Sequence, residues 1–127
     1  MSQTILLIED EKVMRDVCAD RLKKEGFTVL EADNGTHGMD MALTDQPDLI
    51  ILDNRMPEMG GYQTLRMLRE KNNWGAGVPV IFFTNVELTA DAEADIAETN
   101  PAHYLVKSDT SLDMLVTKVR ELLGNSD

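Results

Sequence analysis

Polar residues capable of chemistry follow four apolar runs of the sequence, each at the point where the run ends. The runs cover residues 4–8, 49–52, 80–83 and 104–106. The residues that follow them are Glu9-Asp10, Asp53, Thr84 and Lys107. If the runs are parallel strands of one sheet, their ends bring three carboxylates, a hydroxyl and an ammonium group to one edge. Together these groups could hold a hard cation and a phosphoryl group.

The three carboxylates have two possible uses. Glu9, Asp10 and Asp53 offer only oxygen ligands, which suit Mg²⁺, an ion that keeps several waters and often shares phosphate oxygens. An acidic residue after a strand can instead cap the next helix. Read alone, Asp10 fits the capping role, but its pairing with Asp53 at the end of another strand favours the metal site.

The elements that must position these residues can be predicted from the spacing of apolar residues. Runs of strand length alternate with segments of helical period. The predicted strands cover 4–8, 27–32, 49–52, 78–83 and 103–106, and the predicted helices cover about 11–25, 36–45, 61–72, 88–99 and 111–123, with 73–79 as a loop. This alternation favours a parallel α/β sheet with helices on both faces. Ligands of such sheets bind beyond the carboxyl ends of the strands.

Composition and charge narrow the class of protein. The chain has 127 residues, the size of one domain, with 43% hydrophobic and 28% charged residues. A net charge of −11 argues against direct binding to nucleic acid or to an anionic membrane surface. No apolar run reaches the roughly 20 residues that span a bilayer, so we expect no membrane insertion. A single cysteine, Cys18, fits a reducing, cytoplasmic location and is expected to be buried and inert.

The segment 49–61 resembles the phosphorylation segment of bacterial two-component response-regulator receiver domains. It has an apolar strand, Asp53, two variable residues, Met56-Pro57 and a glycine-containing turn. Further matches in register are Glu9-Asp10, Asn34-Gly35, Thr84, Tyr104 and Lys107. The resemblance covers essentially the whole chain. It implies a chemotaxis-regulator-like single domain over 1–127, with a flavodoxin-like, doubly wound sheet of five parallel strands in the order 2-1-3-4-5.

The resemblance implies a role for each acidic residue. Asp53 would accept a phosphoryl group from a phosphohistidine and form an acyl phosphate. Asp10 and Asp53 would hold Mg²⁺, Glu9 would reach the metal through water, and the backbone carbonyl of Arg55 would be a further ligand. The phosphohistidine would belong to a sensor histidine kinase or a histidine phosphotransfer protein.

The resemblance also implies roles for three residues at the other strand ends. Lys107 would contact a phosphoryl oxygen and Thr84 would donate a hydrogen bond to the phosphoryl group. Tyr104 would be a switch residue that turns inward when Thr84 moves. Each residue taken alone also has an ordinary structural explanation. Lys107 could be a solvated surface lysine, Thr84 could bond to the backbone, and Tyr104 could be a half-buried aromatic residue of a strand. Under the family reading, the surface of 88–99, 103–106 and 111–123 would meet a downstream protein target.

Three positions depart from the family pattern or vary within it. Ser108 stands where the family usually has proline after the lysine, and we predict a trans Lys107-Ser108 bond, because a cis bond to a non-proline residue costs about 2.5–4 kcal/mol. Asn85 stands where a small residue is usual, and it could narrow access to Asp53, bond to the phosphoryl group or be a loop amide without a role. Arg55 could lie over the site and change the lifetime of the acyl phosphate.

A signalling receiver would be a phosphorylatable switch and not a turnover enzyme. Three other functions are compatible with parts of the sequence. A non-phosphorylated pseudo-receiver would act as a binding module only, and Ser108 and Asn85 leave that open. A phosphatase of the haloacid dehalogenase type normally needs a second aspartate where this chain has Arg55. A flavodoxin-like cofactor site lacks a glycine or Ser/Thr cluster in the first loop. A receiver could be a stand-alone regulator, a phosphorelay shuttle or a piece of a longer protein.

Overall fold

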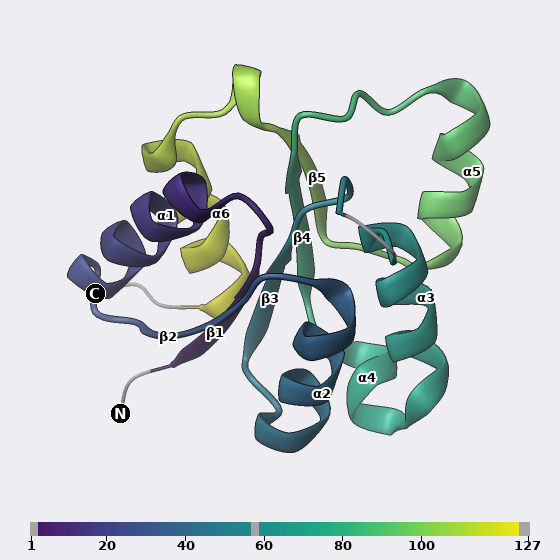
Figure 1. Ribbon diagram of the computed structural model, residues 1–127, viewed down its shortest axis with the longest axis horizontal. Helices are drawn as coiled ribbons and strands as arrows, with labels where there is room; N and C mark the ends of the chain where they lie inside the picture. Colours follow the sequence, from purple (N-terminus) through teal and green to yellow (C-terminus); the bar gives the residue numbers. More distant parts are fainter. Residues whose placement is uncertain (1–2, 57–58, 125–127) are drawn as a thin grey trace.

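The computed structural model describes residues 3–56 and 59–124, which form one parallel sheet covered by helices on both faces (Figure 1). The strands are β1 (Thr4–Ile8), β2 (Thr28–Ala32), β3 (Leu49–Leu52), β4 (Val80–Thr84) and β5 (His103–Val106). Their order is β2-β1-β3-β4-β5, and every neighbouring pair is parallel. The predicted α/β class and strand order are confirmed.

The helices divide between the two faces of the sheet. They are α1 (Lys12–Lys24), α2 (Gly35–Asp45), α3 (Gly61–Lys71), α4 (Asn73–Gly77), α5 (Ala90–Glu98) and α6 (Leu112–Leu123), with a 3₁₀ turn η1 (Lys107–Asp109) after β5. One core packs α1 and α6 against the sheet, and the other packs α2, α3 and α5 against the opposite face (Figure 1). Within the described ranges, no helix has the length and apolar character needed to cross a bilayer.

Strand β1 shows why the predicted strands read as continuous apolar runs. Ile5 and Leu7 lie in the core beneath α1 and α6, whereas Leu6 and Ile8 lie in the core on the other face. All four side chains are at most 2% exposed. Because successive side chains of a strand point to opposite faces, a strand buried on both faces must be apolar throughout.

The register of the sheet brings the strand ends together. Ile8 pairs with Leu52, so the residues that follow β1 and β3 leave the sheet at the same level. Thr84 pairs with Val106 at the ends of β4 and β5. The edge predicted to carry the polar residues is therefore formed by adjacent strands.

Helix α4 corrects the prediction of a loop over residues 73–79. The Asn72 side chain accepts a hydrogen bond from Gly75 N at 2.7 Å and caps the helix start. At its other end, the Arg69 guanidinium donates to the carbonyl oxygens of Gly75 and Val78 at 3.0 and 2.6 Å. The loop prediction relied on local composition, and it was wrong because Arg69 of the preceding helix α3 satisfies carbonyl groups of this short helix.

Candidate functional site

The structure brings together the three carboxylates that follow β1 and β3. Oxygen atoms of Glu9, Asp10 and Asp53 all lie within 4.8 Å of one another. Glu9 and Asp53 are 2% and 6% exposed, whereas Asp10 is open to solvent. Carboxylates held this close repel one another unless a cation balances them, and their oxygens are the ligands that Mg²⁺ prefers. The donor set therefore fits that ion.

Backbone hydrogen bonds fix the two buried carboxylates. Glu9 N donates to Ala32 O at 3.0 Å, and Asp53 N donates to Ile8 O at 3.1 Å, so each residue extends the ladder of the sheet by one bond. Arg15 adds a hydrogen bond from Nη1 to Glu9 O at 2.8 Å. These residues consequently share the rigidity of the central strands rather than that of a loop.

The turn after Asp53 is joined to the start of α3. The Asn54 side chain accepts from Tyr62 N at 2.9 Å, and Gly61 N donates to Asn54 O at 3.2 Å. A Cβ at position 61 would lie 2.5 Å from Asp53 O, so only glycine allows this close approach. The glycine-containing turn of the sequence thus has a steric reason.

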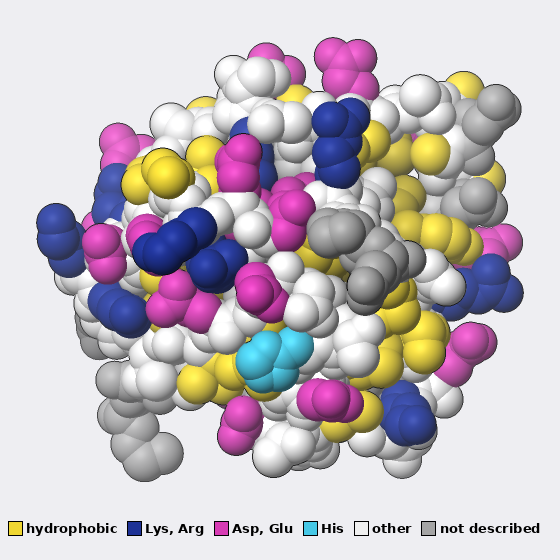
Figure 2. All heavy atoms as spheres, in the orientation of Figure 1, with side chains coloured by type: hydrophobic (Ala, Val, Ile, Leu, Met, Phe, Trp, Pro, Cys, Tyr) yellow, Lys and Arg dark blue, Asp and Glu magenta, His cyan; other side chains and the backbone are white. Residues whose placement is uncertain are grey.

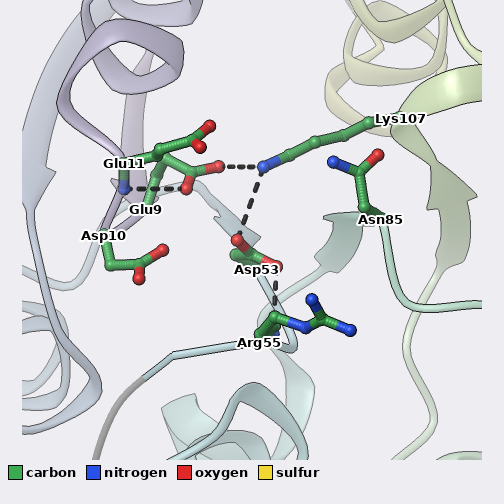
Figure 3. Close-up of a pocket in the computed structure, with 7 residues that line it drawn as sticks. All are labelled: Glu9, Asp10, Glu11, Asp53, Arg55, Asn85 and Lys107. Atoms are coloured by element: carbon green, nitrogen blue, oxygen red, sulfur yellow. Dashed lines mark hydrogen bonds and ion pairs between the residues drawn. The ribbon is translucent and has the colours of Figure 1, made fainter.

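Lys107 lies inside the site rather than on the surface (Figure 3). Its Nζ forms an ion pair with the Glu9 carboxylate and lies 3.4 Å from Asp53 Oδ2. The side chain is 7% exposed, and Nζ lies 5.9 Å from the centroid of the Phe83 ring. The alternative that Lys107 is a solvated surface lysine is therefore wrong.

Burial and charge act in opposite directions on this cluster. Burial raises the pKa of Glu9 to about 7, although hydrogen bonds from Lys107 and from Glu11 N oppose the rise. Burial alone would lower the pKa of Lys107, but its bond to Glu9 and the negative charge of Asp53 outweigh burial and raise it. The ammonium group stays charged and serves as the internal counter-ion of the carboxylates.

These groups line a pocket of about 160 Å³ at the edge of the sheet (Figure 3). Its lining residues are Glu9, Asp10, Glu11, Asp53, Arg55, Asn85 and Lys107. When all four carboxylates are ionised, they exceed the two cationic side chains by two negative charges, which one divalent cation would balance. The volume is below the roughly 300–1,000 Å³ of pockets for organic ligands, which argues against a flavin-like cofactor.

Arg55 and Asn85 both line the pocket, as the sequence-based hypotheses required. Arg55 N also donates to Asp53 Oδ1 at 3.0 Å. The Lys107-Ser108 peptide bond is trans, as predicted, and the chain continues from Lys107 into η1. The altered loop thus still places the Lys107 side chain between two carboxylates.

Thr84 and Tyr104 lie outside this pocket. Thr84 is fully buried and its Oγ1 accepts a hydrogen bond from Val86 N at 3.2 Å. The Tyr104 hydroxyl donates to Val86 O at 2.7 Å, and its ring centroid lies 5.3 Å from that of Phe82. The two side chains are thus bonded to the N–H and the carbonyl of the same residue, and among the described residues no hydrogen bond joins either one to the carboxylates.

Sequence reasoning missed Glu11, Arg15 and Asn54. Glu11 lines the pocket, and its backbone N donates to Glu9 Oε2 at 3.1 Å. Its position directly after the acidic pair was a signal. Arg15 and Asn54 act through backbone carbonyl or amide groups, for which residue type and spacing give no comparable signal.

Comparisons with known proteins agree with this geometry. The family model for the response regulator receiver domain matches residues 5–120. The chain is 36% identical over 119 residues to the transcriptional regulatory protein CusR of Escherichia coli strain K12, covering 94% of this chain and 50% of that protein. It is 36% identical over 124 residues to the probable transcriptional regulatory protein SilR of Salmonella typhimurium, covering 96% and 52%. The chain spans about half the length of these curated relatives.

Solved structures with the same fold include two at low sequence identity. The chemotaxis protein CheY4 of Vibrio cholerae matches with a TM-score of 0.87 at 20% identity, covering 96% of this chain and 99% of that one. The receiver domain of the Francisella response regulator 1452 matches with a TM-score of 0.85 at 22% identity, covering 99% and 100%. These matches confirm the chemotaxis-regulator-like fold.

Proposed function

This chain belongs to the response regulator receiver domain family, and from that premise we propose that it is a phosphorylation-driven switch whose phosphoryl acceptor is Asp53. The observation that carries the proposal is the buried Asp53 carboxylate, which shares a small pocket with two acidic neighbours and the Lys107 ammonium group. The proposal treats residues 1–127 as one receiver domain that works in the cytoplasm.

Asp53 would act as the nucleophile toward a phosphohistidine of a sensor histidine kinase or phosphotransfer protein. One carboxylate oxygen forms the new P–O bond while the P–N bond of the phosphohistidine breaks, which leaves an acyl phosphate on the protein. Lys107 is near enough to Asp53 to bind a phosphoryl oxygen once that group is attached. Its pairing with Glu9 keeps the ammonium group aimed into the pocket.

The oxygen-only donor set supports Mg²⁺ as the cofactor of this step. Asp10 and Asp53 would hold the ion directly, with Glu9 through water and with the backbone carbonyl of Arg55. Bound Mg²⁺ would supply charge neutralisation for the transferring phosphoryl oxygens. The buried backbone positions of Glu9 and Asp53 mean that little of this arrangement has to be assembled on binding.

The link through Val86 supports a switch built on Thr84 and Tyr104. The Thr84 hydroxyl oxygen accepts a hydrogen bond from Val86 N, and a phosphoryl group on Asp53 would offer its proton a charged acceptor toward which the side chain could move. Moving Thr84 would then change the segment whose carbonyl holds the Tyr104 hydroxyl. Two alternative side-chain arrangements joined in this way form a two-state element.

Phosphorylation of the intact protein tests the proposal. We expect one phosphoryl mass increment with Mg²⁺ and acetyl phosphate, no increment in Asp53→Asn, and an unchanged increment in Asp40→Asn, a matched change at an exposed aspartate of α2. Chelation of the metal should suppress the reaction. An increment that survives in Asp53→Asn would mean that another residue is the acceptor, and no increment in the wild type would favour a pseudo-receiver.

Arg55 provides a finer test of the same site. Its side chain lines the pocket entrance and is exposed, so it can approach an attached phosphoryl group without restructuring the core. We expect Arg55→Ala to change the rate at which the acyl phosphate hydrolyses, measured by loss of the mass increment after the donor is removed. An unchanged rate would reject this role for Arg55.

A further inference from the structure

A second pocket lies at the other end of the sheet from the carboxylates. It has a volume of about 480 Å³ and is formed by α4 and by the segments that precede β3 and β4. Asp48 precedes β3 and Asp53 follows it, so the two residues stand roughly 16 Å apart at about 3.3 Å per residue. The pocket shares no lining residue with the carboxylate site. Its volume falls in the range of pockets that take organic ligands.

Trp74, the single tryptophan of the chain, forms part of the pocket wall. Its side chain is half-buried, because it packs against the core on the α2 and α3 face while also lining the pocket. The short helix that carries it is held in place. Arg69 donates to the carbonyl oxygens of Gly75 and Val78, and a Cβ at position 75 would collide with Leu68 O. The indole is therefore fixed before any ligand arrives, which lowers the entropy cost of binding.

Asp48 is the charged residue of the pocket wall. Its Oδ2 accepts a hydrogen bond from Thr4 N at 2.7 Å, and its N–H donates to Thr4 O at 2.8 Å, so the residue is anchored to β1. Among the described residues, its Oδ1 has no hydrogen-bond partner. The side-chain amides of Gln46 and Asn73 also line the pocket and form no hydrogen bond with described residues. One carboxylate oxygen and two amides are thus available to a ligand.

Within the described residues, no cation neutralises the Asp48 carboxylate. None of the lining residues is basic, and residues 25–54 contain no lysine or arginine. Asp48 takes part in no ion pair of the described chain, and Lys71, which precedes α4, does not line the pocket. On the α1 side of the molecule, by contrast, basic side chains lie among acidic ones (Figure 2). The pocket therefore combines a negative charge with an aromatic side chain and contains no cation of its own.

We propose that this pocket binds a small planar organic cation, an amidinium or guanidinium compound with an apolar body. The cation would lie over the face of Trp74, where the ring quadrupole attracts it. Its N–H groups would donate to Asp48 Oδ1 and to the amide oxygens of Gln46 and Asn73. Its apolar body would contact the prolines that line the same pocket. Binding here would not require phosphorylation of Asp53.

The composition of the pocket argues against other classes of ligand. An anion would be repelled by Asp48, and a neutral molecule of the same shape would gain neither the ion pair nor the cation–π attraction. A metal ion would find a single carboxylate in a partly apolar wall, which is a poor donor set for Mg²⁺ or Ca²⁺. All lining residues fall within 46–48 and 73–79, so the pocket is a compact site for a small molecule.

Benzamidine, benzamide and benzoate provide a matched set of probes, because they have nearly the same shape and are a cation, a neutral molecule and an anion at neutral pH. The fluorescence of the intact protein reports their binding directly, since Trp74 is its single tryptophan. We expect benzamidine to change the Trp74 emission with a Kd of about 1 mM, benzamide to bind roughly tenfold more weakly and benzoate not to bind. Equal affinities of benzamidine and benzamide, or an emission unchanged by benzamidine, would overturn the proposal.

Variants separate the pocket from the overall negative charge of the protein. Asp48→Asn removes the charge and keeps an amide oxygen that can accept from Thr4 N, so the fold should persist. It should weaken benzamidine binding roughly tenfold. Asp40→Asn makes the same change of net charge on exposed α2 and should leave the Kd unchanged. Equal losses in the two variants would indicate nonspecific attraction and would reject the pocket.

Backbone amide resonances locate the bound probe. Benzamidine should shift amides within 46–49 and 72–78, and shifts confined to other segments would reject the pocket. A peptide of about ten residues with one central arginine distinguishes a free ligand from a side chain of a partner protein. We expect it to bind more weakly than benzamidine, because the compact pocket leaves the flanking residues without contacts. Tighter binding of the peptide would overturn the small-molecule assignment in favour of a protein-docking site.

The titrations are made without Mg²⁺ or a phosphoryl donor, which keeps this inference separate from the proposed function. Asp53→Asn should bind benzamidine as the wild type does. Benzamidine binding by a protein that gains no phosphoryl mass increment would refute the function proposed for Asp53 and support the pocket. A mass increment in a protein that does not bind benzamidine would have the opposite meaning.

Discussion

The two halves of the strand-end edge differ in how firmly the fold holds them. At the ends of β1 and β3, Glu9 and Asp53 continue the hydrogen-bonded ladder and are nearly fully buried. Beyond β4, the chain leaves the sheet into an exposed segment and α5, where Ile96 is the one buried apolar side chain among those described. The half that would hold the metal and phosphoryl group is therefore built into the sheet, and the half that would signal lies on its least buried helix.

Ion pairs show the same contrast. Arg21 joins α1 to Asp113 of α6, and Arg120 of α6 reaches Glu25 at the end of α1. Helix α5 has no ion pair among its described side chains. Groups that do chemistry need fixed positions, whereas elements that move in a switch are drawn from the less stable parts of a structure. The fold therefore separates these two requirements in space.

Hydrogen exchange should show the contrast with the largest effect. We expect backbone amides of α5 to exchange on the order of a hundredfold or more faster than those of β1 and β3, because α5 can open without disrupting the sheet. Exchange of the intact protein, followed by amide-resolved NMR or mass spectrometry, measures both regions in one sample. Similar protection in α5 and the central strands would contradict the division.

Two isoleucines provide a matched test by mutation. Ile51 of β3 is 1% exposed and Ile96 of α5 is 5% exposed. We expect Ile51→Ala to lower the free energy of unfolding by about 4 kcal/mol and Ile96→Ala by about 2 kcal/mol, because the surroundings of Ile96 can collapse around the lost volume. Urea denaturation gives both values. Equal losses would show that α5 is packed as tightly as the central strand.

The same contrast explains what the sequence could reveal. The five strands and the meeting of Glu9, Asp10 and Asp53 follow from local apolar patterns and from the geometry of parallel sheets. The ion pair of Lys107 with Glu9 joins residues 98 positions apart, and its geometry depends on how two loops fold. The strand-end pattern predicts the Lys107 ammonium group at this edge of the sheet, but residue spacing does not predict its direct ion pair with Glu9.

The region around α4 and α5 was harder to predict because hydrogen bonds to backbone groups hold it together. Helix α4 depends on carbonyl contacts from Arg69, and the link of Thr84 and Tyr104 passes through the backbone of Val86. A backbone acceptor is present at every residue, so the sequence does not mark which one is used.

Arg69 is the residue that secures the far end of α5, and its removal should have the next largest effect. Its guanidinium donates to the carbonyls of Thr99 and Asn100 as well as to those of Gly75 and Val78. Burial lowers the pKa of Arg69, but these four acceptors still solvate its charge. We expect Arg69→Met to lower the free energy of unfolding by roughly 1–3 kcal/mol and to speed amide exchange in residues 96–102.

Arg21→Met is the control for this change, because Arg21 forms ion pairs at the surface with carboxylates that water can solvate instead. It should have a much smaller effect on unfolding and none on exchange in α5. If Arg21→Met were as destabilising as Arg69→Met, surface charge rather than carbonyl capping would explain the result.

The smallest effect concerns Cys18, which reports on the firmly held side of the molecule. The thiol is 1% exposed, and burial raises its pKa from 9.0 to about 11. Because the unfolded chain loses this proton at lower pH than the folded one, the stabilising contribution is complete below pH 9 and declines as the pH rises toward 11. Between pH 7 and about pH 9.5 the decline should be on the order of 1 kcal/mol, and Cys18→Ala should remove that part of the pH dependence. Urea denaturation at both pH values measures this decline in the free energy of unfolding, and alkylation of native Cys18 should be as slow as global opening.

Rapid alkylation, or identical pH dependence in the variant, would mean that α1 opens locally and that the carboxylate half is less firmly held than the burial of Glu9 indicates.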